Sequence, residues 1–136
     1  MRKLCYFVAC SVDRFIAAPD GSFGFFLQAG EHIDMQVREF PETLPTHLRD
    51  ALGIMAGNRV FDTVIMGQRT YKVGLDQGIA SPYAHLKQYV VSKSLTQSPH
   101  ENVTLIRDEP LDTVRRLKNE PGKDIWLCGG GELAST

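Results

Sequence analysis

Three short stretches of this sequence place glycine, hydroxyl or basic side chains directly after apolar runs. They are residues 67–70 (Gly-Gln-Arg-Thr), 92–93 (Ser-Lys) and 129–131 (Gly-Gly-Gly). Glycine lets the backbone turn sharply and touch a flat or charged ligand, because it has no Cβ atom. Cations, hydroxyl groups and the free N–H groups of a helix start are common partners of phosphate. Each stretch therefore indicates an anion site, although three glycines alone would also serve as a plain connection.

The last of these stretches matches a known spacing. Gly129, Gly131 and Ala134 satisfy G-x-G-x-x-A, after the apolar run at residues 125–128. In the dinucleotide fingerprint this spacing belongs to the first strand–helix turn, and an acidic residue follows about 20 positions later. Here the spacing comes last in the chain, so we do not expect that fold.

Strand-like and helix-like segments alternate along the chain. Strands are expected at residues 4–12, 63–66, 88–92, 102–107 and 125–128, and helices at 31–40, 46–52, 68–72, 110–119 and from 132 onward. The alternation predicts one three-layer α/β/α domain over residues 1–136, with a mostly parallel sheet. We expect the first strand to be central. Because ligands collect at the carboxyl ends of such strands, the three stretches should meet at one edge of the sheet.

The helix patterns also predict which side chains face inward. The residues expected to be buried are Ile33, Val37 and Phe40 in the first helix, Leu48, Ala51 and Leu52 in the second, and Leu111, Val114 and Leu117 in the helix at 110–119. Asp108 is expected to cap that last helix.

The composition is that of an ordinary globular domain. The 136 residues are 43% hydrophobic and 23% charged, and 15 basic against 16 acidic residues give a formal charge of −1. This balance gives no attraction to nucleic acid or to an anionic membrane. No segment reaches the roughly 20 apolar residues of a membrane span. Cys5, Cys10 and Cys128 are an odd number in apolar runs, so we expect buried free thiols and a cytoplasmic protein.

Four segments, in order and spanning the chain, carry a family resemblance: residues 7–17, 61–71, 89–93 and 124–134. Together they resemble the dihydrofolate reductase-like superfamily, and most closely the reductase domain of bacterial riboflavin biosynthesis (the C-terminal domain of the bifunctional deaminase-reductase). The resemblance implies a dihydrofolate reductase-like sheet and a reductase that uses NADPH.

The resemblance also implies a cofactor site and no metal. Ala9 and Ile16 would border the nicotinamide, and Ser92 and Lys93 would face the 2′-phosphate. The full set of implied cofactor-binding residues is Ala9, Ile16, Gly67, Gln68, Arg69, Thr70, Ser92, Lys93, Gly129, Gly130, Gly131, Glu132 and Leu133.

The sequence departs from the family pattern in three ways. Gln68 stands where the family usually has arginine, and Arg14 where it usually has glycine. The family also continues with further strands beyond the last helix. We therefore expect a chain that lacks the C-terminal strands or is completed by a partner chain, with a homodimer as the expected assembly.

The implied reaction is hydride transfer to a C=N or C=O carbon of a pteridine- or pyrimidine-type molecule, of the dihydrofolate or riboflavin-precursor class. Asp34 is the candidate carboxylate for holding the substrate, with Glu31 and Glu39 as rivals and a solvated Asp34 as the alternative. The competing function is a nucleotide-binding or dimerisation domain without turnover. Metal hydrolysis through His32 and Asp34 is disfavoured, because residues two apart on a helix point in different directions.

Overall fold

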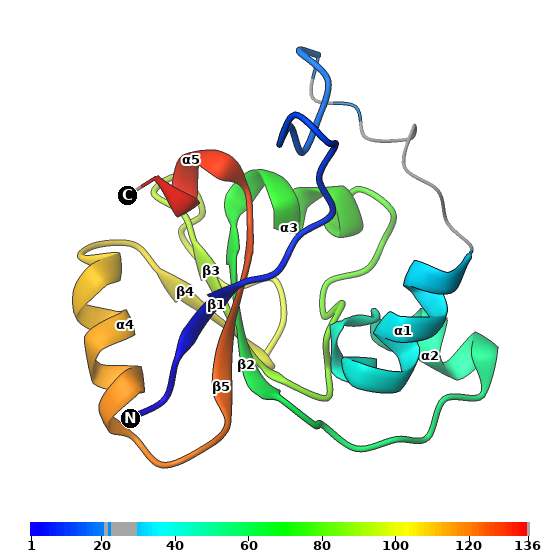
Figure 1. Cartoon of the computed structure of the whole chain (residues 1–136). Helices are drawn as coiled ribbons and strands as arrows, with labels where there is room; N and C mark the ends of the chain where they lie inside the picture. Colours follow the sequence, from blue (N-terminus) through cyan, green and yellow to red (C-terminus); the bar gives the residue numbers. More distant parts are fainter. Residues whose placement is uncertain (21, 23–29, 136) are drawn as a thin grey trace.

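The computed structural model describes residues 1–20, 22 and 30–135. Five parallel strands form one sheet in the order β1-β5-β2-β3-β4 (Figure 1). The strands are β1 Leu4–Tyr6, β2 Phe61–Gly67, β3 Lys87–Val91, β4 Val103–Ile106 and β5 Asp124–Gly129.

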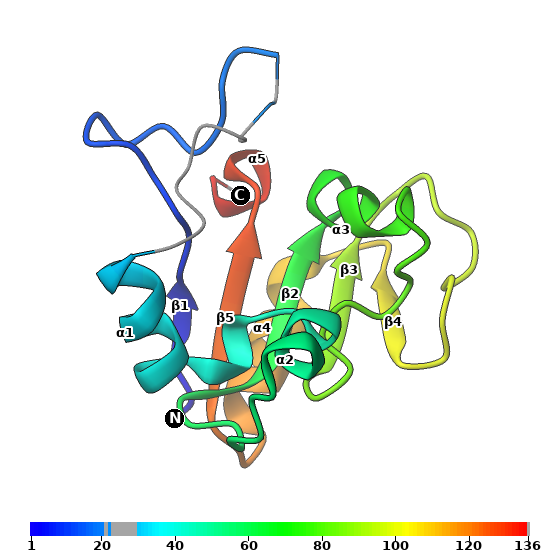
Figure 2. The same cartoon turned by 90° about the vertical axis from the view of Figure 1, so that its right-hand side faces the viewer.

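Helices cover both faces of the sheet, as Figures 1 and 2 show from two sides. They are α1 Glu31–Glu39, the 3₁₀ turn η1 Pro41–Thr43, α2 Thr46–Leu52, α3 Gln68–Leu75, α4 Pro110–Asn119 and α5 Gly131–Ala134. On one face Tyr71 of α3 packs with Val64 and Trp126. On the other face Leu117 of α4 packs with Ile65. This arrangement confirms the three-layer α/β/α fold, of the dihydrofolate reductase-like type.

The central strand is β5 rather than the first strand. It pairs with β1 on one side and with β2 on the other. The prediction of a central strand at residues 4–12 is wrong, because β1 ends at Tyr6 and lies at the edge of the sheet. An apolar run predicts a strand, but it does not say which neighbours that strand pairs with.

The strand register brings four strand ends to the same level. Gly67 of β2 pairs with Val91 of β3, which pairs in turn with Ile106 of β4. Gly129 of β5 pairs with Met66 of β2. The residues that follow these strands must therefore meet at the carboxyl edge, as the sequence predicts.

The second helix forms where expected but buries a different side chain. Leu48 and Leu52 are 39% and 59% exposed and Ala51 is exposed, whereas Arg49 is only 8% exposed. The guanidinium of Arg49 donates a hydrogen bond to the carbonyl of Ala56, in the segment that follows the helix. This hydrogen bond goes with an inward orientation of the side of α2 that carries Arg49, which the spacing of apolar residues does not predict.

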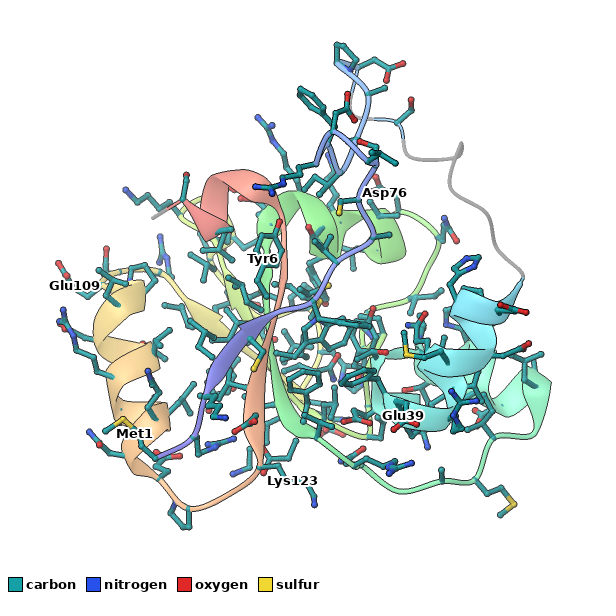
Figure 3. The ribbon with its side chains drawn as sticks, viewed as in Figure 1. Met1, Tyr6, Glu39, Asp76, Glu109 and Lys123 are labelled. Atoms are coloured by element: carbon teal, nitrogen blue, oxygen red, sulfur yellow. The ribbon has the colours of Figure 1, made fainter. Side chains whose placement is uncertain are left out.

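Two expectations for α4 also fail, although its bounds are as predicted. Glu109 rather than Asp108 is the cap residue, with φ 49°, and no side chain caps the helix. Leu111 is 49% exposed, whereas Leu117 is fully buried. Figure 3 shows Glu109, just before the first turn of α4, on the outer side of the α4 layer and away from the sheet. Leu111 in this turn therefore stays exposed, whereas Leu117 near the other end of the helix packs against the sheet with Ile65.

A buried carboxylate fixes the start of β2. Glu42 is fully buried, and its Oε2 accepts the N–H groups of Val60 at 2.7 Å and Phe61 at 2.6 Å. The carbonyl of Glu42 lies 2.7 Å from Nε2 of His85, whose Nδ1 lies 3.0 Å from the Thr46 hydroxyl. Since a carbonyl can only accept, Nε2 of His85 carries the proton and Nδ1 accepts from Thr46.

The three cysteines differ in exposure, and none is in a disulfide. Cys5 and Cys128 are half-buried, but Cys10 is exposed. The expectation of three buried thiols is therefore wrong for Cys10, because the chain leaves the sheet after Phe7 and residues 8–10 are exposed. In the described part of the chain, no helix is long and apolar enough to cross a membrane.

Candidate functional site

A cavity of about 650 Å³ lies at the carboxyl edge of the sheet, on the side of α4. Four strand ends and the first residues of α3 and α4 form its wall. The lining residues are Gly67, Gln68, Arg69, Val91, Ser92, Lys93, Arg107, Asp108, Glu109, Pro110, Gly130 and Leu133. Seven of the predicted cofactor-binding residues therefore share one cavity.

Gly67 is needed where β2 and β5 come close together. It ends β2 and is the residue before α3. A Cβ atom at this position would lie 3.2 Å from the carbonyl oxygen of Gly129 and 3.4 Å from the nitrogen of Gly130. Both atoms belong to the backbone, so a side chain here would have to displace the glycine turn that follows β5.

The glycine turn presents its backbone to the cavity. Gly129 has φ 123°, a conformation that favours glycine, and the ring of Tyr6 lies 3.8 Å from where its Cβ would be. The Gly129–Gly130 peptide bond is cis. A Cβ on Gly130 would lie 3.8 Å from the hydroxyl oxygen of Thr70, which places Thr70 beside the cavity. The backbone of Gly131 and Glu132 belongs to α5, a helix of four residues that is too short to have a useful dipole.

A hydrogen-bond network joins α3 to the turn after β3. The Oε1 of Gln68 accepts the Ser92 hydroxyl at 2.8 Å and the Ser94 hydroxyl at 2.7 Å. Ser92 is 3% exposed, and its oxygen also accepts the N–H of Leu95 at 3.1 Å. Gln68, Ser92 and Ser94 are called the Gln68 clamp below.

The charged groups of the cavity wall are three cations and two carboxylates. Arg69, Lys93 and Arg107 face the same space as Asp108 and Glu109, and all five are exposed. Arg107 was not singled out from the sequence, although it directly follows β4 just as Ser92 follows β3. The rule that ligands collect at strand ends would have found it, if applied to the fourth strand as well.

Of the predicted site residues that do not line this cavity, three lie on segments away from it, namely Ala9, Ile16 and Asp34. Ala9 is exposed and Ile16 is half-buried, in the segment that Figure 1 shows rising from β1 beyond the carboxyl edge. Asp34 is exposed on α1, which covers the face of the sheet opposite α4 (Figure 2). Arg14, in the same segment as Ile16, has φ 70°, which is costly for a residue with a side chain. Glycine, which the resemblance implies at this position, adopts such a conformation at less cost.

The strand that carries the glycine turn also holds Cys128, a half-buried residue whose thiol group itself is enclosed. Burial raises the pKa of Cys128 to about 12, although the hydrogen bond from Tyr83 lowers it in part. Burial and the neighbouring Cys128 raise the pKa of Tyr83 well above its usual value. Both groups are therefore neutral near pH 7, and Cys128 is not a reactive thiolate. Within the described residues, no group of three His, Cys, Asp or Glu side chains could hold a metal ion.

The fold and this edge define a three-layer α/β/α domain of the dihydrofolate reductase-like type, with an anion-compatible cavity at the carboxyl ends of its strands. The chain belongs to the same family as the uncharacterized protein YwjB of Bacillus subtilis (strain 168), with which it shares 30% identity over 98% of its own length and 67% of YwjB. It also shares 30% identity with the uncharacterized protein YyaP of the same organism, over 99% of the chain and 66% of YyaP. No family model matches the chain.

A solved structure has the same fold. It is a protein from Shewanella sp. PV-4 named "Putative riboflavin biosynthesis protein", with a TM-score of 0.59 and 22% identity over 96% of this chain and 66% of that one. The chain thus spans about two thirds of the length of each of these three proteins.

Proposed function

We propose that the chain is an NADPH-dependent reductase that transfers hydride to a pteridine- or pyrimidine-type molecule. The observation that supports this most is the meeting of a glycine turn and three cations in one cavity at the carboxyl ends of β2 to β5. The name of the Shewanella protein supports the riboflavin-precursor class, and the dihydrofolate class stays as the alternative substrate.

The residues present fit the nucleotide. The cavity volume of about 650 Å³ lies within the usual range for small-molecule sites, which is roughly 300–1,000 Å³. Gly67 and Gly130 leave room for a diphosphate against the backbone, and the first N–H groups of α3 favour an anion. Arg69, Lys93 and Arg107 supply the charge that a 2′-phosphate needs. The overall charge of −1 gives no such attraction, so the local cations carry the selectivity.

NADPH, when bound, supplies the hydride, and the chain supplies binding, orientation and exclusion of water. The glycine turn after β5 would hold the diphosphate and nicotinamide end. Ala9 and Ile16 would approach the nicotinamide from the segment after β1. Asp34 is the proposed contact for the substrate, on the other face of the sheet, and Asp34→Asn should lower turnover without changing NADPH affinity.

The proposal is tested by nucleotide binding and by turnover. Calorimetry should give tighter binding of NADPH than of NADH, and Arg69→Met or Lys93→Met should narrow the difference. Lys72→Met is the matched control, because Lys72 is exposed on α3 but does not line the cavity. Loss of NADPH absorbance with a pteridine or pyrimidine acceptor would demonstrate the reaction. Equal affinity for both nucleotides would remove the case for a 2′-phosphate contact.

A second candidate function is an interaction domain that binds nucleotide without turnover and pairs with a second copy. It is favoured by the edge of the sheet at β1, where Leu4 and Tyr6 are 38% and 44% exposed. Among the described residues, β1 pairs with β5 alone. A free edge with apolar side chains can add a strand from another chain. Sedimentation analysis of the wild type and of Leu4→Lys tests it: a dimer that the substitution dissociates, together with NADPH binding but no oxidation, would favour this function.

A further inference from the structure

We propose that Gln68 is a positioning residue that sets the preference of the cavity for a 2′-phosphorylated nucleotide, by holding Lys93 in place through Ser92 and Ser94. The proposal rests on the function proposed above and adds to it the residue that controls nucleotide selectivity.

The hydroxyl hydrogens of Ser92 and Ser94 are both used inside the Gln68 clamp. Each hydroxyl has one hydrogen, and both hydrogens go to the same acceptor, Oε1 of Gln68. Neither serine can then donate to a phosphate while the Gln68 clamp is closed. Ser92 is moreover 3% exposed and already accepts from Leu95. Selectivity for the 2′-phosphate must therefore come from the cations, and the two serines affect the ligand only by positioning Lys93 between them.

Lys93 is held by the clamp through its two neighbours in the chain. It lies between Ser92 and Ser94 in the sequence, so the clamp fixes the backbone on both sides of it. Lys93 itself is exposed, and a lysine side chain has much conformational freedom to lose when it binds. Ordering Lys93 on binding costs both backbone and side-chain entropy, and a backbone that is already fixed removes the first of these two costs.

Arg107 contacts the same turn as Lys93. Its Nη2 lies 3.5 Å from the carbonyl oxygen of Lys93, and both residues line the cavity. The N–H of Ser92 also donates to the carbonyl of Ile106 at 3.0 Å. These two contacts join the turn after β3 to the end of β4, and Gln68 joins the same turn to the start of α3.

The ligands for the test are adenosine 2′,5′-bisphosphate and AMP, which differ only in the 2′-phosphate. Calorimetry on the wild type should show a preference for the bisphosphate. Gln68→Met keeps the side-chain length but removes the acceptor, and it should reduce the preference for the bisphosphate over AMP about tenfold. Ser94→Ala, which removes one of the two clamp contacts, should reduce the preference about threefold. Gln77→Met, on an exposed residue outside the cavity, is the matched control.

A double variant separates positioning from direct contact. If Gln68 acts through Lys93, Gln68→Met should have little further effect in a Lys93→Met background, because coupled residues are not additive. Additive effects, or an equal loss for AMP and the bisphosphate, would overturn the role of Gln68. So would an unchanged preference in Gln68→Met. A wild type without any preference would instead count against the proposed function itself, so the two failures are distinguishable.

Discussion

The close approach of β2 to the glycine turn gives a prediction that can be worked out from distances. In Gly67→Ala, the new Cβ would lie 3.2 Å from the Gly129 carbonyl oxygen and 3.4 Å from the Gly130 nitrogen. Gly67 has φ −75°, so alanine is allowed by the backbone itself. The effect must then come from the contact, which requires the backbone of the glycine turn to move by a few tenths of an ångström.

The expected cost to stability is modest, and the expected cost to binding is larger. Overpacking of this kind costs roughly 1–3 kcal/mol, and we expect about 1 kcal/mol because the displacement is small. The glycine turn is also the surface on which the diphosphate would lie. A shifted turn should therefore weaken NADPH binding by about tenfold, which is about 1.4 kcal/mol.

The assay is urea unfolding combined with calorimetric titration of NADPH. Gly57→Ala is the matched control, since no heavy atom lies within 4 Å of its Cβ position. That variant should bind NADPH as the wild type does, and its stability should be unchanged or higher by about 0.4–1 kcal/mol. A Gly67→Ala variant that unfolds at lower urea but binds NADPH with undiminished affinity would refute the role of the glycine turn.

Three further predictions concern the buried groups that support the site. Glu42→Ala should cost about 2–5 kcal/mol in urea unfolding, because it orphans two buried N–H groups; Glu42→Gln should cost less, since an amide oxygen can still accept. Burial lowers the pKa of His85, and the charge of Arg49 lowers it further. The hydrogen bond to the Glu42 carbonyl and the charges of the Glu42 and Asp50 carboxylates offset this lowering in part. The folded state thus binds fewer protons than the unfolded one, so this stability is complete above the usual pKa of 6.5 and is lost as pH falls below it. Wild type should lose more stability than His85→Gln between about pH 7.5 and 5.5, and equal losses would contradict the assignment. A thiol reagent should modify the exposed Cys10 first. It should modify Cys128 only on unfolding, because the pKa of about 12 keeps that thiol protonated; early labelling of Cys128 in the Cys10→Ser variant would contradict this.

The sequence was most informative where a pattern depends on local chemistry. The apolar runs located β2, β3, β4 and β5, and the helix pattern gave the bounds of α4 without error. The glycine and basic stretches after those strands came together because parallel strands in register end at one edge. These predictions need only the local pattern of apolar residues and the rule that ligands bind at the carboxyl ends of parallel strands.

What could not be predicted depends on contacts between distant segments. The edge position of β1 follows from the two neighbours of β5, which no local pattern contains. The inward face of α2 depends on the hydrogen bond from Arg49 to the carbonyl of Ala56. The burial of Glu42 depends on its hydrogen bonds with the N–H groups of Val60 and Phe61, which lie 18 and 19 residues further along the chain. The Gln68 clamp spans 24 residues to Ser92, so the sequence suggested a missing cation at Gln68 rather than a tether.

A map of amide chemical shifts on titration with NADP⁺ tests whether the ends of β2, β3, β4 and β5 form one nucleotide site. The shifts should gather at the cavity, on the amides of residues 67–70, 92–94, 107–109 and 129–133. Shifts that gather instead at the opposite edge of the sheet, around the second cavity lined by Arg2, Lys118 and Gly122, would contradict it.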